Sequence, residues 1–320
     1  QDPSVRPYIK ERVIQAVKEL DYHPNLVARA LRGNNLQIVP IAVLELGEFY
    51  YGELASQISR QLVEIGLEPA LCFNPKHLMK MSRSFSTSAS ILVFGSDYET
   101  VHELSRFQKV VTIDSLLPLM PSVGNVSIAF DVVYRHLAET LLRRGRRRIA
   151  ISSGHYLRCL ERGWPAQKLP AVFEVLAEAG FDTVGGRSRH VFGSAGDVAA
   201  WVGAHPGSVD AVICENDLEA ARVIGEFAEL GLGTPDDVLV VGCDANCKLA
   251  GMWSVKLDTH QIAVRAVAIL KRLLDGETIR DNPQYIPELL DEFDQPIPFA
   301  AGDIARTIRK RRPSTPSTKI

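Results

Sequence analysis

The sequence lacks the features of a membrane-spanning, secreted or metal-binding protein. Its longest apolar stretches, such as residues 38–44 and 238–241, end well before the roughly 20 residues that a membrane-spanning helix requires. The start at Gln1-Asp2-Pro3 has neither the basic residues nor the apolar core of a secretory signal. A cytoplasmic location, without contact with a membrane, is therefore expected.

Cysteine is also scarce, with five residues that stand singly and form no CxxC pair. Cys243 and Cys247 are close in sequence, but no two further ligands lie near them, so a structural metal site is not expected. The odd count and the scattered positions favour reduced, unliganded thiols. These thiols are at positions 72, 159, 214, 243 and 247.

Signatures of catalysis are missing as well. No glycine-rich phosphate loop precedes a predicted helix, and no GxSxG motif is present. The run Ser152-Ser153-Gly154-His155 offers a hydroxyl group and an imidazole, but adjacency in sequence does not create triad geometry, and a polar loop after a strand explains it. We therefore expect a protein that is not an enzyme and has no cofactor.

The chain has no general excess of positive charge. Its 36 lysines and arginines face 38 aspartates and glutamates, giving a net charge of −2, so any contact with nucleic acid requires a local basic segment. Three such segments exist, at 29–32, 143–148 and 306–319. We expect 143–148, which contains Gly145, to be a solvated turn, and the Pro-, Ser- and Thr-containing tail from 303 to be disordered.

The sequence contains enough apolar residues to form more than one hydrophobic core. Its 320 residues are 46% hydrophobic and 23% charged, which is typical of a soluble globular protein with two or more compact units. Residues 7–20 predict a helix, because Pro7 suits its first position and apolar residues such as Val13 and Val17 recur at helical spacing. Residues 25–31 predict a second, short helix that Asn25 caps and Gly33 ends.

From residue 36 onward, strand and helix patterns alternate. Such alternation predicts parallel sheets built from βαβ units, and about a dozen elements divide naturally into two sheets. We therefore predict an α/β protein with two lobes, each a doubly wound parallel sheet. The predicted strands are 38–44, 69–73, 90–94, 109–113, 148–152, 209–213 and 238–242. The predicted helices are near 52–65, 98–106, 132–144, 165–179, 195–203, 217–230 and 260–274.

Residues 22–32, Tyr-His-Pro-Asn-Leu-Val-Ala-Arg-Ala-Leu-Arg, resemble the hinge of the lactose-repressor/galactose-repressor family, whose pattern is Tyr-x-Pro-Asn-x-x-Ala-Arg-x-Leu. Residues 5–13 look like the last helix of the family's DNA-binding headpiece, so most of its helix-turn-helix is missing from this sequence. The resemblance continues to about residue 290. It is carried there by Asn216-Asp217, Gly231-Leu232, Pro235-Asp236-Asp237-Val238 and Val241-Gly242-Cys243-Asp244.

The resemblance implies a fold, a domain organisation and partners. The body should be of the type I periplasmic-binding-protein-like class, preceded by a remnant of the headpiece (1–24) and a hinge helix with its linker (25–35). The N-terminal lobe should comprise 36–130 with 258–285, the C-terminal lobe 131–257 with 286–302, and the basic tail 303–320. The implied partners are operator DNA, a small effector, most naturally a carbohydrate, and a second copy of the chain in a homodimer.

For the hinge, elementary physics agrees with the resemblance. Cations on a short helix in the minor groove can meet phosphates, while an apolar side chain such as Leu31 can wedge between base steps and kink the duplex. A linker helix packed on its own domain is the alternative. The hinge residues that the resemblance assigns to DNA are Asn25, Ala28, Arg29, Leu31 and Arg32.

The candidate effector residues follow predicted strands, where parallel α/β sheets present their ligand sites. Carboxylate and amide groups suit sugar hydroxyls, and aromatic rings suit an apolar ring face. The family usually has an effector-binding Arg three residues before a Gly-aromatic pair, but at that offset from Gly163 this sequence has Leu160, so Arg158 and Arg162 become the candidates. The full set is Phe49, Tyr50, Asp131, Arg158, Arg162, Trp164, Asn216 and Asp244.

Several of these residues also have a simpler structural interpretation. Asp131 and Asp217 can cap helices, and Trp164 can belong to a core. For the whole chain, the leading hypothesis is a repressor or activator whose affinity for DNA depends on an effector bound between the lobes. The alternatives are a sugar-binding protein of a transport system, which the hinge motif disfavours, and a sensor that no longer binds DNA.

Overall fold

The structure is a computed structural model that describes residues 6–20, 37–43, 48–93, 98–115, 117–118, 120–163, 166–181, 183–184, 187–188, 190–247, 249–281 and 284–300. Within these ranges no helix combines the length and the apolar character needed to cross a membrane. The hinge residues Asn25 to Arg32, the side chain of Trp164 and the basic tail lie outside the described residues.

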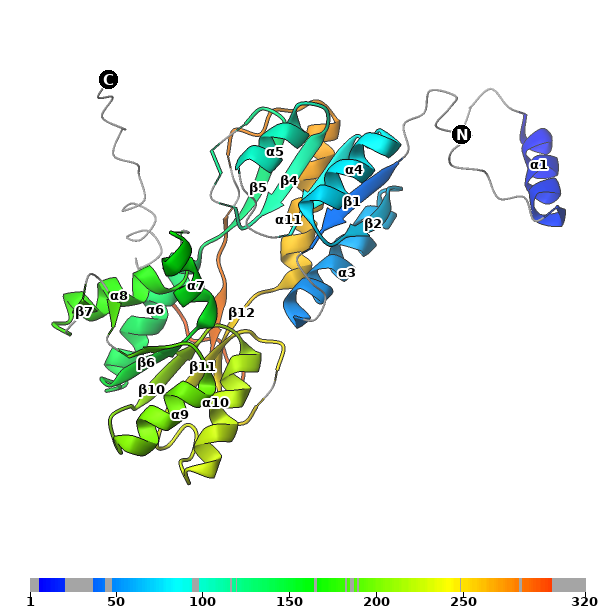
Figure 1. Ribbon diagram of the computed structural model, residues 1–320. Coiled ribbons are helices and arrows are strands. Elements are labelled where there is room, and N and C mark those ends of the chain that lie inside the picture. Colours follow the sequence, from blue (N-terminus) through cyan, green and yellow to red (C-terminus); the bar gives the residue numbers. More distant parts are fainter. Residues whose placement is uncertain are drawn as a thin grey trace, which may run out of the picture.

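The body has two lobes, each built on a sheet of six strands (Figure 1). In the N-terminal lobe the order is β13-β5-β4-β3-β1-β2, and every pair is parallel. The bounds are β1 (Ile38–Ala42), β2 (Glu68–Cys72), β3 (Ala89–Leu92), β4 (Lys109–Ile113), β5 (Val123–Ile128) and β13 (Gln284–Tyr285). This lobe therefore has the parallel sheet that the alternation of patterns predicted.

The sheet of the C-terminal lobe has the order β14-β12-β11-β10-β6-β9. Its pairs are parallel except for the antiparallel pair of β12 and β14. The bounds are β6 (Ile149–Ser152), β9 (Val191–Phe192), β10 (Ala211–Cys214), β11 (Leu239–Asp244), β12 (Trp253–Lys256) and β14 (Glu288–Leu290). A small antiparallel hairpin, β7 (Thr183–Val184) with β8 (Arg187–Ser188), lies beside α8.

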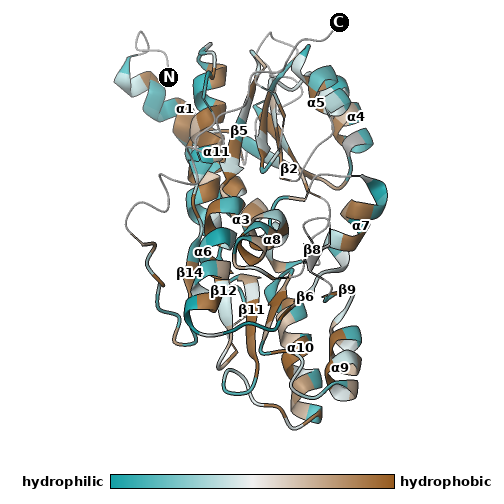
Figure 2. Ribbon diagram, turned by 90° about the vertical axis from the view of Figure 1, so that its left-hand side faces the viewer, coloured by the Kyte–Doolittle hydropathy of each residue, from teal (hydrophilic) through white to brown (hydrophobic). Residues whose placement is uncertain are grey.

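Helices cover both faces of each sheet because each has one apolar stripe, which packs on the apolar strands (Figure 2). The N-terminal lobe carries α3 (Phe49–Glu64) and α11 (Thr259–Leu274) on one face and α4 (Pro75–Phe85) and α5 (Tyr98–Ser105) on the other. The C-terminal lobe carries α6 (Phe130–Arg143), α7 (Gly154–Arg162), α8 (Leu169–Glu178), α9 (Ala195–Ala204) and α10 (Asp217–Glu229).

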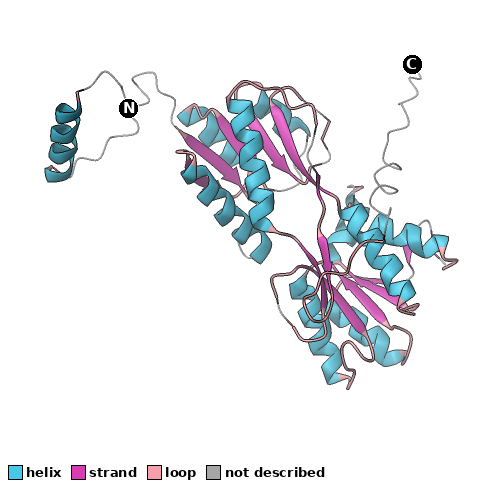
Figure 3. Cartoon of the chain, turned by 180° about the vertical axis from the view of Figure 1, so that it is seen from behind, coloured by secondary structure: helices cyan, strands magenta, loops and turns pink. Residues whose placement is uncertain are grey.

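The chain crosses between the lobes three times, after β5, after β12 and between β13 and β14 (Figure 3). Tyr285 ties two of these crossings together, because its hydroxyl accepts a hydrogen bond from the backbone N–H of Asp258 at 2.8 Å and donates one to the carbonyl of Lys256 at 3.4 Å. The carboxyl ends of the parallel strands therefore lead toward the region between the lobes, where the crossings occur.

The N-terminal helix α1 (Pro7–Glu19) forms where the apolar spacing predicted it. None of its residues is buried, and Val13 is 56% exposed and Leu20 77% exposed. In Figure 1 it stands apart from the two lobes. The helix thus keeps an apolar stripe that nothing in the described part of the chain covers.

Candidate ligand-binding site between the lobes

The region between the lobes gathers polar groups from both sides. The N-terminal lobe contributes Tyr50 and Tyr51 from the first turn of α3 and Asp114 from the residue after β4. The C-terminal lobe contributes Asp244, at the end of β11, and Lys168, which precedes α8. These groups are close enough to shift one another's pKa values.

A direct hydrogen bond joins the two sides of this site. The side-chain amide of Gln167 donates to the carbonyl of Asp114, with 3.1 Å between nitrogen and oxygen. Asp114 itself has a positive φ of 57°, an uncommon conformation for a residue with a side chain. The loop after β4 thus lies against the segment before α8, and the two lobes touch where the polar side chains gather.

Lys168 is the cation of this site, and its side chain is half-buried. Its Nζ donates to the carbonyl of Glu215 at 3.0 Å and lies 3.3 Å from the sulfur of Cys243, while the ring of Phe130 is 5.0 Å away. Burial by itself lowers the pKa of Lys168, but interactions with Cys243, Tyr134 and Asp244 outweigh burial and raise that pKa well above its usual value. The side chain therefore stays protonated, and its charge points into the site.

Asp244 is the carboxylate that faces this cation. Burial raises its pKa from 3.8 to about 7, although Lys168 favours the ionised form and opposes the shift. Its φ of 99° and the φ of 53° at Ala245 show that β11 ends in a strained turn. Such strain persists only where surrounding contacts hold the backbone. Here Asp244 lies close enough to Tyr50 of the other lobe to raise the pKa of that tyrosine.

Asp217 supplies those contacts. One oxygen of its buried carboxylate accepts from the Ser254 hydroxyl at 2.7 Å, and the other accepts from the backbone N–H groups of Asn246 at 2.8 Å and Cys247 at 3.1 Å. A Cβ on Gly242 would lie 2.2 Å from an oxygen of Asp217, so this position requires glycine. Asp217 therefore acts as the anchor of the turn that carries Asp244.

Asn216 has a different role in the structure. Its side-chain oxygen accepts a hydrogen bond from the backbone N–H of Glu219 at 2.9 Å, which makes Asn216 the N-cap of α10. Asp131 lies in the first turn of α6, where a carboxylate interacts favourably with the helix dipole. These two residues thus stabilise the starts of helices that border the site.

We expect Asn216→Ala to reduce the free energy of unfolding by about 1 kcal/mol, the usual cost of losing a polar N-cap. Denaturant titration at neutral pH measures this change. Asn216→Asp serves as the matched control, because aspartate retains the capping oxygen and should stay close to wild type. An alanine variant as stable as wild type would contradict a capping role.

The aromatic and basic candidates differ in how far the structure buries them. Tyr50 packs against the main core, and burial raises the pKa of its hydroxyl well above 10.0, whereas its neighbour Phe49 is 71% exposed. Arg158 and Arg162 are both exposed on α7. Lys168 is the cation that acts on the pKa of Asp244, and Arg158 and Arg162 remain the effector residues that the offset from Gly163 predicts.

Lys168, Asp114 and Gln167 were missed by the sequence analysis. The search for a cation was fixed to the Gly163-Trp164 pair, whereas the chain turns into α8 only at Leu169, five residues after that pair. A signal was available, because Lys168 is the last basic residue before an apolar helix that follows a predicted strand and loop. Gly163 of that pair is instead the C-cap of α7, where it has a positive φ of 65°.

The polar loop after β6 is built around a helix cap. The Ser153 hydroxyl accepts from the backbone N–H of Tyr156 at 3.1 Å and thereby caps α7. A Glu215 oxygen accepts from the Ser153 hydroxyl and from the backbone N–H of His155. The His155 ring instead faces the buried thiol of Cys159, at 3.4 Å, so these contacts account for the polar run as a structural loop.

The chain is similar to known bacterial transcription regulators. Residues 138–291 match the family model described as a periplasmic binding protein-like domain. The chain is 22% identical over 305 residues to catabolite control protein A of Priestia megaterium, covering 91% of each chain. It is 26% identical to the HTH-type transcriptional repressor PurR of Vibrio parahaemolyticus, covering 88% of each chain.

Solved structures show the same fold. A Lac repressor structure bound to ONPG matches with a TM-score of 0.73 and 18% identity, and the match covers 92% of this chain and 93% of the other. In total, 67 curated proteins and 263 solved chains match significantly, those named above included. Over about nine-tenths of its length the chain is thus similar in sequence to bacterial transcription regulators, and it shares the two-lobed parallel fold of a Lac repressor.

Proposed function

We propose that this protein is a DNA-binding transcription regulator, most simply a repressor, whose affinity for its operator is controlled by a small effector held between the two lobes. The observation that carries the proposal is that Lys168 and Asp244 of one lobe lie close enough to Tyr50 and Asp114 of the other lobe for these groups to shift one another's pKa values. A ligand that contacts both sides favours one arrangement of the lobes and thereby shifts a two-state equilibrium.

The effector we propose is a polar, hydroxyl-bearing metabolite such as a sugar. Asp244 and Asp114 offer acceptors, Lys168 offers a charged donor, and Tyr50 and Tyr51 offer both hydroxyl groups and ring faces. One relative of this fold was solved in complex with cellobiose and another with lactose. Arg158, Arg162 and Trp164 remain proposed contacts at the rim of the same site.

DNA binding is proposed to rest on the hinge helix, 25–35, with the headpiece remnant at 1–24 and the lobes and tail divided as the sequence predicted. Asn25, Ala28, Arg29, Leu31 and Arg32 would meet the minor groove. We propose a homodimer as the DNA-binding form. Strand β2 supports this, because it is the edge strand of its sheet and exposes Leu71 (44%) and Phe73 (49%), a surface that a second copy can cover.

A thermal-shift screen against sugars, sugar phosphates and nucleosides tests the proposed effector site. A ligand present at about 100 times its dissociation constant adds about 2.7 kcal/mol to stability, which gives a clear rise in melting temperature. The hit must then change operator affinity in a chain that also carries a helix-turn-helix. A hit that stabilises the protein but leaves operator affinity unchanged would favour the transport-type or sensor alternatives.

We expect Leu31→Ala, in that extended chain, to weaken operator binding and leave effector affinity unchanged. The wedge acts in the hinge, whereas the effector binds between the lobes, so the two equilibria are separable. Operator titration and effector calorimetry on the same preparation measure both. If Leu31 were instead a core residue, the substitution would lower the melting temperature of the body, through a loss of about 2–5 kcal/mol.

A further inference from the structure

A basic surface lies at the edge of the N-terminal lobe where the strands of its sheet begin. It is formed by Lys80 and Arg83 of α4, Arg106 after α5 and Lys109 at the start of β4, and we refer to these four residues as the basic edge. Two adjoining depressions, of about 480 and 700 Å³, share Arg83 and together include all four cations. No local sequence pattern marks this group, because its members come from four separate positions along 30 residues of chain.

Hydroxyl groups line the same surface. The larger depression is bordered by several serines, and it includes Ser86, whose φ of 47° turns the end of α4. Beneath it, buried Gln108 holds the floor in place through hydrogen bonds from its amide nitrogen to Ser90 at 3.1 Å and Ser82 at 3.3 Å. The hydroxyl groups and cations thus sit on a rigid, internally satisfied base.

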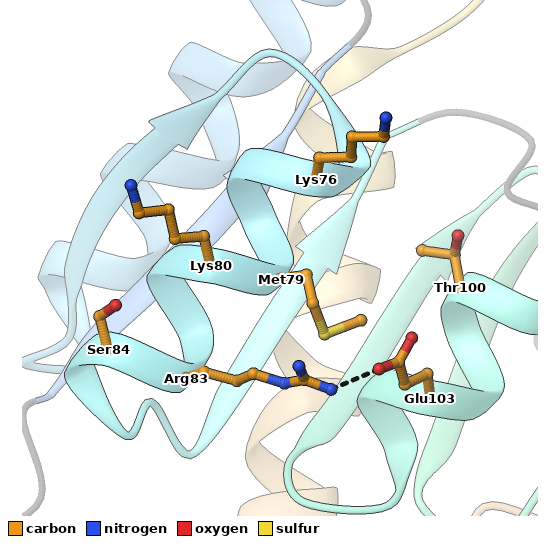
Figure 4. Close-up of a pocket in the computed structure, with 7 residues that line it drawn as sticks. All are labelled: Lys76, Met79, Lys80, Arg83, Ser84, Thr100 and Glu103. Carbon is orange, nitrogen blue, oxygen red and sulfur yellow. Dashed lines mark hydrogen bonds and ion pairs between the residues drawn. The ribbon is translucent and has the colours of Figure 1, made fainter.

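Most of the positive charge of the basic edge is unneutralised. Arg83 reaches across from α4 to Glu103 of α5, whereas Lys76 and Lys80 extend outward (Figure 4). The side chains of Lys80, Arg106 and Lys109 have no hydrogen-bond or ion-pair partner within the described ranges. The ends of α4 and α5 contribute only about half a negative charge each, so an excess of roughly two positive charges is left.

The basic edge adjoins the point where the proposed hinge joins the body. Lys109 of β4 pairs in register with Ala89 of β3, and the register of β3 with β1 puts Val39 on the same row. Because neighbouring strands lie about 4.8 Å apart, the start of β4 is only about 10 Å from the start of β1. In Figure 1 β1 begins at the end of the lobe that faces away from the C-terminal lobe.

We propose that the basic edge binds phosphates of the DNA that flanks the site held by the hinge. This inference rests on the proposed function, which brings DNA to the start of β1. Duplex DNA carries about one negative charge per 1.7 Å of axis, so a surface about 10 Å from the hinge exit with free cations meets a dense row of phosphates. Glu64 and Glu68 lie on the β2 side of the hinge exit, so contact is confined to the side of β3 and β4.

The chain contains a matched control at the opposite pole of the body. Arg143 and Arg147 belong to the other basic run, which precedes β6 at the edge where the sheet of the C-terminal lobe begins. Both side chains are exposed, as are those of Lys80 and Arg106. The variants Lys80→Gln/Arg106→Gln and Arg143→Gln/Arg147→Gln therefore remove the same charge from opposite ends of the molecule.

The test is the salt dependence of duplex binding by the 320-residue chain, measured by fluorescence anisotropy over about 50–200 mM salt. Each lost phosphate contact reduces the steepness of the plot of log K against log salt by about 0.9. The slope of Lys80→Gln/Arg106→Gln should therefore be about 1.8 less steep than that of wild type. The control should keep the wild-type slope. Melting curves must show that both variants fold like wild type, and Lys80→Glu/Arg106→Glu should enlarge the loss if they do.

Two results would overturn the proposal. Equal slopes for wild type and Lys80→Gln/Arg106→Gln would show that the basic edge does not reach DNA, and equal losses in both double variants would show only a general effect of charge. Inorganic phosphate could instead stabilise wild type but not Lys80→Gln/Arg106→Gln, while the salt slopes of the two proteins stay equal. That result would assign the surface to a small anion rather than to DNA. A failure of the proposed function itself would be detected in a separate measurement. In that case no effector would change the operator affinity of the extended chain.

Discussion

Replacing Lys168 by Met is expected to weaken effector binding by roughly 10- to 150-fold, the equivalent of about 1.5–3 kcal/mol for a lost hydrogen bond to a charged group. Lys168 is fixed by the carbonyl of Glu215, and its charge faces Asp244. Methionine keeps the unbranched shape of the stem but removes the donor. Isothermal titration with an effector found by screening measures the change, and a melting curve shows whether the fold survives.

Arg158→Met and Arg162→Met are the matched controls for this experiment. Both arginines are exposed on α7 and are proposed only at the rim of the site, so their loss should weaken effector binding less than the loss of Lys168 does. Lys168→Arg separates charge from shape, because a guanidinium keeps the charge but needs a planar fork of acceptors. If Arg158→Met abolished binding while Lys168→Met did not, the offset from Gly163 would be the better guide and the geometry would mislead.

Lys168 and Arg158 illustrate which features of the protein can be predicted from its sequence and which cannot. Alternating apolar patterns predicted β1, β4, β10 and β11 with the helices between them, because such patterns depend only on local period. They missed α4 and α7, whose apolar stripes are short and interrupted by charged residues. They also missed β5, β12 and β14. Gly124 and Asn125 interrupt the apolar pattern of β5, and β14 is three residues long and joins its sheet antiparallel.

Within the site, contacts between residues close in sequence could be predicted, whereas contacts between residues far apart in sequence could not. Asn216 followed three residues later by Glu219 is the spacing of a helix cap, so the sequence already contained the role that the structure shows. Asp217, by contrast, is fixed by Ser254, 37 residues farther along the chain. No periodicity connects those positions, and only the parallel pairing of β11 with β12 brings Ser254 beneath the turn.

The pH dependence of stability offers a second large effect, centred on Asp244. Burial raises its pKa in the folded protein to about 7, whereas the unfolded chain has the usual value near 3.8. The folded state therefore holds a proton that the unfolded state releases, and stability falls as pH rises through this window. Below pH 4 both states are protonated at Asp244, so its contribution is then complete.

Asp244→Asn should remove this loss. Asparagine resembles the protonated carboxyl group in shape, so we expect the variant to match wild type near pH 4 and to melt at a higher temperature than wild type at pH 8. The charged and titratable groups that face Asp244 are Lys168, Asp217, Cys243 and Glu48. Lys168 opposes the shift, so adding Lys168→Met should raise the pKa further and widen the difference between the two proteins at pH 8.

Melting curves of wild type, Asp244→Asn and Asp217→Asn between pH 4 and pH 8 separate the two buried carboxylates. Burial raises the pKa of Asp217 as well, but its hydrogen bonds from Ser254, Cys247 and Asn246 favour the ionised form and limit that shift. Asp217→Asn should therefore destabilise the turn at every pH, because the amide cannot accept all three hydrogen bonds. Parallel curves for wild type and Asp244→Asn would show that Asp244 is already ionised throughout this range, and that Lys168 dominates its environment more strongly than burial does.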